Sequence, residues 1–475
     1  MAFSEISLKE LHKELKGSYP EKIELLPASG SDRSYFRIFS DDGKSCIGTW
    51  NEEVKENEAF IYFSDHFNKC MLPVPEVLIV DKNKKTYLQS DLGDDTLFSV
   101  LSSNGLSDEV VFHYMNVVRW LPAFQVRGIK GLDLSYCYPR QHFDRQSMMW
   151  DLNYFKYYFA RLSGIKFDEQ ALEDDFLTLV DFLLTANRNY FMFRDFQSRN
   201  IMILNNKPYF IDYQGGRSGA LQYDLASLLY DAKANLPPAF RNELIEEYLK
   251  ALAVETNKEI NRDDFLKYFN GFALLRILQA LGAYGFRGFY QKKEHFLQSI
   301  PYAMKNLRQL FGNNDFIVKL PELSKLPDYG SNAVVLREIP KTDLKVRITS
   351  FSYKHGIPND TTGNGGGFVF DCRALPNPGR LVDYQTQSGL DEPVIIYLKA
   401  FPEINSFLEN VFNIVDAAVK NYIDRGFKNL MVSFGCTGGR HRSVYCAEKL
   451  AEHLQQKFGI ITIPEHTRKS NWDSD

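Results

Sequence analysis

The sequence predicts an α+β bilobal fold over its N-terminal two thirds, followed by a smaller α/β domain. Three observations lead to this prediction. Residues 20–90 are rich in strand-like stretches, residues 106–315 carry mostly helical periodicity, and residues 346–475 alternate between the two patterns. A chain of 475 residues has room for two or three domains of ordinary size.

The strand-rich stretch contains three segments with strand character. Residues 34–39 follow a turn rich in glycine and serine, and residues 77–80 and 86–88 flank an Asp-Lys-Asn-Lys turn. The helical stretch has one exception, a strand–loop–strand pattern at residues 190–213. We therefore expect a loop held between short strands inside the helical lobe.

The segment after the helical stretch is irregular, because three prolines and a glycine interrupt it between positions 321 and 340. We expect a linker at residues 319–345, joining a first domain at 1–318 to a second domain at 346–475. The second domain has the periodicity of a strand–helix alternation. Its expected strands are residues 346–351, 368–370 and 430–434, and its expected helices are 403–424 and 441–458.

The composition is that of an ordinary globular protein, with 44% hydrophobic and 24% charged residues. A net charge of −4 gives no global attraction to nucleic acid or to an anionic membrane. The N-terminus lacks the pattern of a signal peptide, and no apolar run is long enough to span a membrane. Since the six cysteines show no metal-ligand spacing, we expect a cytoplasmic protein with reduced thiols.

The motif with the most chemistry is Phe-Arg-Asp-Phe-Gln-Ser-Arg-Asn-Ile at residues 193–201, followed by Phe-Ile-Asp-Tyr-Gln-Gly at 210–215. Phosphoryl transfer needs a carboxylate beside the acceptor hydroxyl, and oxygen ligands that hold Mg²⁺ against the nucleotide phosphates. Asp195 is the candidate catalytic base, and Asn200 and Asp212 are the candidate metal ligands. The pattern therefore predicts a kinase that uses ATP and Mg²⁺.

This constellation resembles the aminoglycoside phosphotransferase family, which has a protein-kinase-like fold, over residues 8–315. Within that family it is most similar to bacterial kinases that phosphorylate N-acetylmuramate and N-acetylglucosamine at the anomeric position. The resemblance implies an ATP-dependent transfer to a hydroxyl of a sugar or amino sugar. It assigns nucleotide binding to Ser29, Gly30, Ser31, Gln89 and Asp91, and support of the catalytic loop to Arg194 and Asp224.

Two departures from the family bear on catalysis. Phe193 stands where the family usually has histidine, and neither Lys44 nor Lys55 is well placed to clamp the nucleotide phosphates. Glu58 is the candidate for the helix glutamate that normally pairs with such a lysine. These departures favour an alternative, a non-catalytic regulator that combines a degenerate kinase fold with a metabolite- or RNA-binding module. The intact base and metal ligands favour the enzyme.

The second domain contains the loop Gly-Cys-Thr-Gly-Gly-Arg-His-Arg-Ser-Val at residues 435–444, between a predicted strand and a predicted helix. Glycines let backbone N–H groups turn toward an anion, and the N-terminus of the helix adds a favourable dipole. The loop is not a Walker A loop, because no Gly-Lys-Ser/Thr follows. The predicted phosphate-binding residues are Cys436, Thr437, Gly438, Gly439, His441, Arg442 and Ser443.

This loop resembles the C-terminal domain of the RNase adapter family RapZ, and residues 351–358 and 370–378 match further signatures of that domain. The match covers residues 346–465. It implies a domain that senses glucosamine 6-phosphate and contributes to RNA binding, so we expect a phosphorylated metabolite as ligand and RNA as a further partner. The end of the chain is only weakly basic, which disfavours RNA. Further ligand candidates are Lys354, Asp360 and Arg373.

A third reading concerns the spacing of Cys436 and Arg442, which is also the loop pattern of cysteine-dependent phosphatases. There a thiolate attacks phosphorus while the arginine binds the phosphate oxygens. Gly435 stands where a histidine commonly precedes that cysteine. A phosphatase activity in the second domain is therefore a further alternative.

Overall fold

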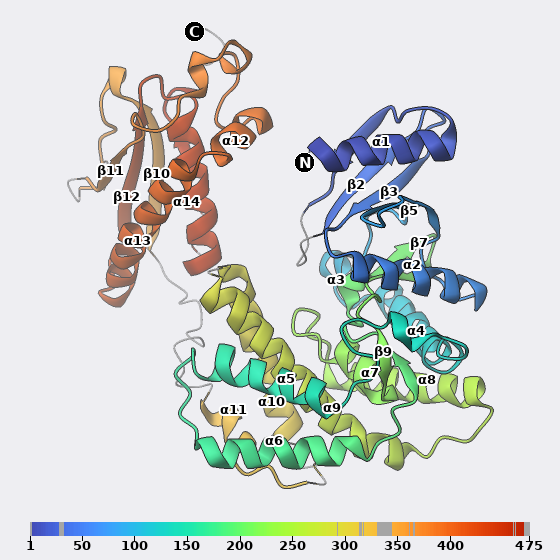
Figure 1. Cartoon of the computed structure of the whole chain (residues 1–475). Coiled ribbons are helices and arrows are strands. Elements are labelled where there is room, and N and C mark those ends of the chain that lie inside the picture. Colours follow the sequence, from blue (N-terminus) through green and yellow to red (C-terminus); the bar gives the residue numbers. More distant parts are fainter. Residues whose placement is uncertain are drawn as a thin grey trace. The chain divides into compact units, whose positions relative to one another are not determined.

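The computed structural model of the chain describes residues 2–27, 33–291, 293–312, 316, 318–329, 344–360, 362–363, 366–458, 460 and 462–469. The chain forms two compact units, Met1–Leu336 and Arg337–Asp475 (Figure 1). Among the helices of the described ranges, none is long and apolar enough to cross a membrane.

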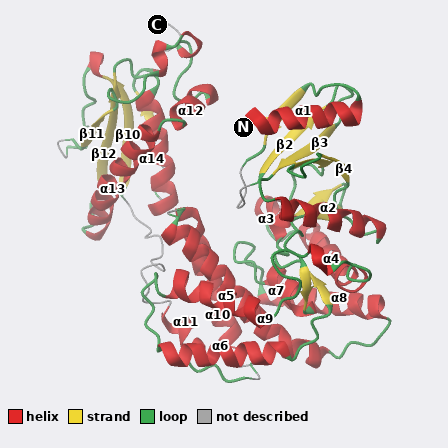
Figure 2. Cartoon of the chain, in the orientation of Figure 1, coloured by secondary structure: helices red, strands yellow, loops and turns green. Residues whose placement is uncertain are grey.

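The first unit begins with an antiparallel five-stranded sheet, drawn in yellow near the N-terminus in Figure 2. The sheet confirms the strand-rich lobe that the sequence predicts. Its strand order is β1-β2-β3-β5-β4. The strands are β1 (Lys22–Leu25), β2 (Ser34–Phe39), β3 (Ser45–Trp50), β4 (Val77–Val80) and β5 (Thr86–Ser90).

Helix α1 (Ala2–Lys16) lies across one face of this sheet and packs on it through Leu8 and Leu11 (Figure 1). Gly48 of β3 allows the close approach, because a Cβ at this position would lie 2.5 Å from Leu8 Cδ2. Side chains alternate across a strand, so the neighbours of these core residues face the opposite side of the sheet. That side borders the cleft described below.

The second lobe of the first unit is mostly helical, as predicted. Short antiparallel ribbons β6–β9 and β7–β8 carry the segment around the catalytic motif. Their strands are β6 (Tyr190–Met192), β7 (Ile201–Leu204), β8 (Lys207–Phe210) and β9 (Arg217–Gly219). The helices of this unit after α1 are α2 (Val54–Lys69), α3 (Leu97–Asn104), α4 (Asp108–Pro122), α5 (Arg145–Phe155), α6 (Glu169–Leu184), α7 (Leu221–Leu229), α8 (Pro238–Thr256), α9 (Arg262–Gly285), α10 (Ile300–Gly312) and α11 (Leu326–Tyr329).

An aromatic core joins the two lobes. The ring of Phe67, on α2, makes edge contacts with Phe124, Phe191 and Tyr213 at centroid distances of 5.4, 4.9 and 5.4 Å. Such ring pairs add about 0.5–1.5 kcal/mol each beyond the area that they bury. One continuous hydrophobic core therefore runs from α2 into the helical lobe.

Part of the segment expected as a linker packs into the first unit instead. Leu320, Leu323 and Leu326 are buried in its core. The carboxylate of Asp175, on α6, accepts hydrogen bonds of 2.7 Å from the backbone N–H groups of both Glu322 and Leu323. The three leucines recur at helical spacing, and this apolar pattern outweighs the nearby prolines that suggested an open connection.

The second unit is an α/β domain with a parallel sheet of order β11-β12-β10-β13. Ser352, at the end of β10, pairs with Cys436, at the end of β12, so both strands finish at the same edge. Helix α12 was not predicted; the other elements were, except the short β13. The elements are β10 (Lys345–Ser352), β11 (Phe368–Asp371), α12 (Glu392–Lys399), α13 (Pro402–Asp424), β12 (Asn429–Cys436), α14 (Arg442–Phe458) and β13 (Glu465–His466).

The packed leucine segment yields a stability prediction. Asp175→Ala leaves two buried N–H groups without their acceptor, so we expect the unfolding free energy of the first unit to fall by about 1–3 kcal/mol. Tryptophan fluorescence during urea unfolding follows this unit, which holds Trp50, Trp120 and Trp150. The matched control is Asp174→Ala at the exposed neighbouring position. Equal unfolding midpoints for the two variants would contradict the anchoring role.

Candidate functional site

The catalytic motif follows β6 directly, and its backbone is held by α7. Asp224 accepts hydrogen bonds from Phe193 N at 2.7 Å and from Arg194 N at 3.0 Å. Arg194 has a φ of +79°, a left-handed conformation that is costly for a residue other than glycine. The two bonds to one buried carboxylate thus fix the sharp turn that precedes Asp195.

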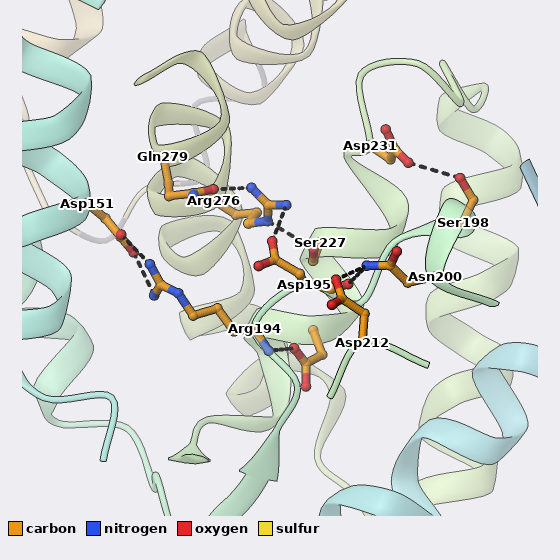
Figure 3. Close-up of polar contacts among 11 residues, drawn as sticks. Asp151, Arg194, Asp195, Ser198, Asn200, Asp212, Ser227, Asp231, Arg276 and Gln279 are labelled. Carbon is orange, nitrogen blue, oxygen red and sulfur yellow. Dashed lines mark hydrogen bonds and ion pairs between the residues drawn. The ribbon is translucent and has the colours of Figure 1, made fainter. Parts of the chain in front are cut away.

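The three residues predicted for chemistry lie together, as Figure 3 shows. Asn200 Nδ2 donates to Asp212 Oδ2 and to the backbone oxygen of Asp195, both at 2.9 Å. All three line a cleft of about 750 Å³. The side chain of Asp195 is about half exposed, at 48%, so its carboxylate can meet a ligand in the cleft.

The chemistry of Asp212 fits a cation ligand. Burial, and then the negative charge of Asp195, raise the pKa of Asp212 to about 6. Gln214 Nε2 donates to Asp212 Oδ1 at 2.6 Å. Within the described ranges, no three His, Cys, Asp or Glu side chains gather as a ready metal cage. One carboxylate and one amide suit Mg²⁺, which usually takes its remaining ligands from water and phosphate oxygens.

Arg276, on α9, is a site residue that the sequence did not reveal. Its Nη2 lies 3.3 Å from Asp195 Oδ1, and its Nε donates to Ser227 Oγ at 2.9 Å (Figure 3). The guanidinium also contacts the Gln279 side chain. Its only signal in the sequence is a lone cation in the apolar run Ala-Leu-Leu-Arg-Ile-Leu. The arginine orients one oxygen of Asp195 from the helical side of the cleft.

Arg194 is held by an ion pair that is largely buried. Its Nη1 and Nη2 donate to the two carboxylate oxygens of Asp151, on α5, at 3.1 and 2.6 Å. Its side chain therefore points away from the cleft while its backbone carries the turn. The neighbouring Phe193 packs against Phe124, Phe191 and Phe196 at centroid distances of 5.1, 5.3 and 5.0 Å.

The predicted nucleotide residues divide into two groups. Gln89 and Asp91 line the cleft from the sheet side. Burial opposes ionisation of Asp91, but hydrogen bonds from Ser45 and from Gly93 N, together with Arg37, lower its pKa. Because its side chain is occupied by these contacts, a contact of Asp91 with an adenine edge would come from its backbone. Ser29, Gly30 and Ser31 lie outside the described residues.

The structure does not bring the lysines considered for phosphate binding to the cleft. Lys44 sits in a turn and is 78% exposed, and the Lys55 ammonium lies over the Tyr138 ring. Glu58 pairs with Lys84 at 2.7 Å rather than with a residue of the cleft. None of them is among the residues that line the cleft.

The C-terminal loop joins β12 to α14. Cys436 Sγ lies 3.1 Å from Ser443 Oγ and accepts from Gly439 N at 3.2 Å. Ser352 Oγ donates to the Thr437 carbonyl oxygen at 2.7 Å. Thr437 and Gly438 form the exposed tip of the loop, whereas Cys436 and its partners Gly439 and Ser443 are buried.

Two of the three basic residues of this loop, His441 and Arg442, face away from its exposed tip. His441 Nε2 lies 2.9 Å from the Tyr384 carbonyl oxygen, and burial lowers the pKa of this histidine. Arg442 is buried, and its Nη1 donates to the carbonyl oxygens of Arg373 and Leu375 at 2.8 and 2.9 Å. An arginine that braces backbone oxygens does not favour the phosphatase alternative, in which it binds the phosphate.

The further ligand candidates of the second unit have local partners. Arg373 pairs with Asp371 at 2.7 Å, and its guanidinium lies 3.9 Å from the Tyr353 ring centroid. Asp360 accepts hydrogen bonds from Thr362 N and Gly366 N within its own loop. Lys354 is exposed. The contacts of Arg373 and Asp360 support loop bracing.

Comparison with known protein families assigns both units. Residues 22–258 match the phosphotransferase enzyme family, and residues 344–469 match the RapZ C-terminal domain. The chain therefore contains a phosphotransferase-family domain and a RapZ C-terminal domain. Together with the observed architecture, this confirms the predicted fold class of both units.

Curated relatives share only part of the chain. A nucleotide-binding protein of Thermotoga sp. strain RQ2 is 42% identical over 121 residues, which is 26% of this chain and 41% of the relative. A nucleotide-binding protein of Clostridium botulinum strain Hall is 34% identical over 169 residues, 35% of this chain and 56% of the relative. The chain thus spans about half the length of these relatives.

Solved structures with a similar trace include small-molecule kinases. Choline kinase from Cryptosporidium parvum Iowa II has a TM-score of 0.47 and 11% identity, over 66% of this chain and 97% of the kinase. Choline kinase LicA from Streptococcus pneumoniae has a TM-score of 0.44 and 12% identity, over 65% of this chain and 99% of the kinase. Likeness at this level carries no information about the acceptor.

The brace on the catalytic loop yields a pH prediction. Burial raises the pKa of Asp224 to about 7, against roughly 3.9 for an unfolded chain. Between these values the folded protein holds a proton that the unfolded chain has released, so the unfolding free energy falls as the pH rises from about 4 to about 7.

Asp224→Asn removes this titration. The stability of the wild type relative to the variant should therefore decline between pH 5 and pH 7, by at most about 1.4 kcal/mol per pH unit. Urea unfolding followed by tryptophan fluorescence at pH 5, 6, 7 and 8 measures this difference. Parallel pH profiles for the two proteins would refute the shift.

Proposed function

We propose that the first unit is an ATP- and Mg²⁺-dependent phosphotransferase that acts on a hydroxyl of a sugar or amino sugar. The observation that carries this proposal is the assembly of Asp195, Asn200 and Asp212 around one cleft between the sheet and the helical lobe. A binding module has no need of a half-exposed carboxylate beside a partly buried carboxylate–amide pair. Phosphoryl transfer needs both.

Each residue has a separate task in this reaction. Asp195 accepts the proton of the acceptor hydroxyl, and Arg276 keeps its carboxylate aimed into the cleft. Asn200 and Asp212 would hold Mg²⁺, which supplies positive charge to the phosphate oxygens. The backbone at Gln89–Asp91 holds the adenine on the sheet side of the cleft.

The charge of the cleft wall supports a neutral or anionic acceptor. Arg199, Arg276 and Arg287 line the helical side of the cleft. Burial, and then the negative charge of Asp231, raise the pKa of Tyr284 to about 12, and the positive charges of these three arginines oppose that rise. No acidic side chain of α9 or of the following turn, Phe286–Tyr290, lines the cleft. A polycationic acceptor is disfavoured by this wall.

Phe193 does not weaken the proposal. The family resemblance assigns a histidine to this position, but here the ring packs in the aromatic core and the backbone N–H still reaches Asp224. The turn that places Asp195 is therefore kept by the hydrogen bonds to Asp224 together with aromatic packing. This weakens one of the two departures that favour the non-catalytic regulator.

The test is ATP turnover by the purified chain against a panel of neutral, acidic and amino sugars, with choline and an aminoglycoside as cationic comparators. We expect turnover on a sugar and a loss of about 10²–10⁴-fold in Asp195→Ala, because the variant lacks the base. The control Asp181→Ala removes an exposed carboxylate on α6. Turnover that survives in Asp195→Ala would refute the role of Asp195 as the base, whereas Mg²⁺-independent ATP binding without turnover would refute the enzyme and support the regulator.

We propose in addition that the second unit binds a phosphorylated sugar at the exposed tip of the 436–443 loop, as a sensor. The argument is the braced loop at the N-terminus of the 17-residue helix α14, with Thr437 and Gly438 open to solvent. A sensor of this kind changes the turnover of the first unit when its ligand is bound.

Calorimetry with glucosamine 6-phosphate tests this second proposal. Gly439 has a φ of +70° and a Cβ there would lie 2.9 Å from Ser352 N, so Gly439→Ala should weaken binding at least about tenfold. Gly426→Ala is the matched control, because Gly426 has the same φ, away from the loop and with no atom near its Cβ position. Equal losses in both variants would contradict the site, and turnover unaffected by saturating ligand would contradict the sensor.

A further inference from the structure

Strand β3 offers no cation to the nucleotide. In many kinases a lysine on this strand binds the phosphates and pairs with a glutamate of the following helix. Here Ile47 lines the cleft, and Thr49 is the next residue of β3 on the same face. Thr49 is short, uncharged and fully buried. The cleft therefore lacks the positive charge at the place where a phosphotransferase normally has it.

Arg33 places a buried cation at the start of the neighbouring strand, next to residues that line the cleft rather than among them. It directly precedes β2, and strand alternation puts it on the same face as Tyr35 and Arg37, which both line the cleft. Tyr35 pairs with Thr49 in the β2–β3 register. The start of β2 is thus adjacent to the position where the lysine is missing.

An ion pair connects Arg33 to helix α2. Its Nη2 lies 3.1 Å from Glu56 Oε2, and Asn51 Nδ2 donates to the same oxygen at 3.3 Å. The arginine side chain is 2% exposed, whereas that of Glu56 is 38% exposed. A strand cation paired with a glutamate in the first turn of α2 reproduces the chemistry of the lysine–glutamate pair with different residues.

The hydrogen bonding of Arg33 is incomplete. Its Nε is buried and has no partner among the described residues. A buried cation whose one carboxylate partner is partly exposed is costly unless further anionic groups approach it, and an unsatisfied buried donor indicates a missing partner. A phosphate group in the cleft would satisfy both the charge and the donor.

We propose that Arg33 is the phosphate-binding cation of the first unit, and that Glu56 holds it in place. This inference rests on the proposed nucleotide site. The alternative role is purely structural, in which Arg33 only ties β2 to α2. The two roles differ in how the affinity depends on the phosphates of the nucleotide.

The test compares the affinities of ATP, ADP and adenosine, each with Mg²⁺, for the full chain and for Arg33→Met. We expect the variant to bind ATP and ADP about 10- to 100-fold more weakly, the usual loss for a hydrogen bond between charged groups, and adenosine as the wild type does. Arg33→Lys should recover part of the loss. Lys84→Met is the matched control, since it breaks an exposed ion pair between Lys84 and Glu58, which lies on α2 as Glu56 does.

The outcomes separate this inference from the function on which it rests. Unchanged ATP affinity in Arg33→Met, or an equal loss for ATP and adenosine, overturns the role of Arg33 while the kinase proposal stands. A wild type that binds no ATP overturns both. If Arg33→Met melts far below the wild type, Glu56→Gln decides the question, because this variant removes the partner of Arg33 and keeps the cation. We expect Glu56→Gln to bind ATP more weakly than the wild type does and to bind adenosine equally well.

Discussion

One buried carboxylate sets the geometry of the whole candidate site. Asp224 accepts hydrogen bonds from the backbone N–H groups of Phe193 and Arg194. These bonds hold Arg194 in a left-handed conformation that costs roughly 1–2 kcal/mol on its own. The direction of Asp195 follows from that turn. The Arg194–Asp151 ion pair locks the same residue from the other side, through its side chain.

Packing and polar contacts share the work of holding the catalytic loop. The aromatic core around Phe193 and Phe67 packs the loop against α2 through ring contacts. Helix α2 also carries Glu56, the partner of Arg33. The same helix therefore supports both the base on one side of the cleft and the proposed phosphate cation on the other.

The sequence predicts most of the fold and the part of the site that lies in one short motif. Asp195 and Asn200 are five residues apart, and a strand pattern leads to Asp212, so local spacing was sufficient to predict these three site residues. Arg276 meets Asp195 across 81 residues, on a helix whose periodicity is that of ordinary core. Arg33 stands before β2, whereas the phosphate-binding cation of many kinases is a lysine on β3, so its place in the sequence does not indicate this role. Contacts between distant segments leave no periodic signal.

The leucine segment at residues 320–326 has a consequence for how such chains are assembled. It lies beyond the residues 22–258 that match the phosphotransferase family, yet it completes the core of the first unit through Asp175. The connection between the two units thus begins as part of the kinase lobe itself. A kinase lobe that is cut out at residue 258, by recombination or by engineering, would therefore lose the leucines that complete its own hydrophobic core.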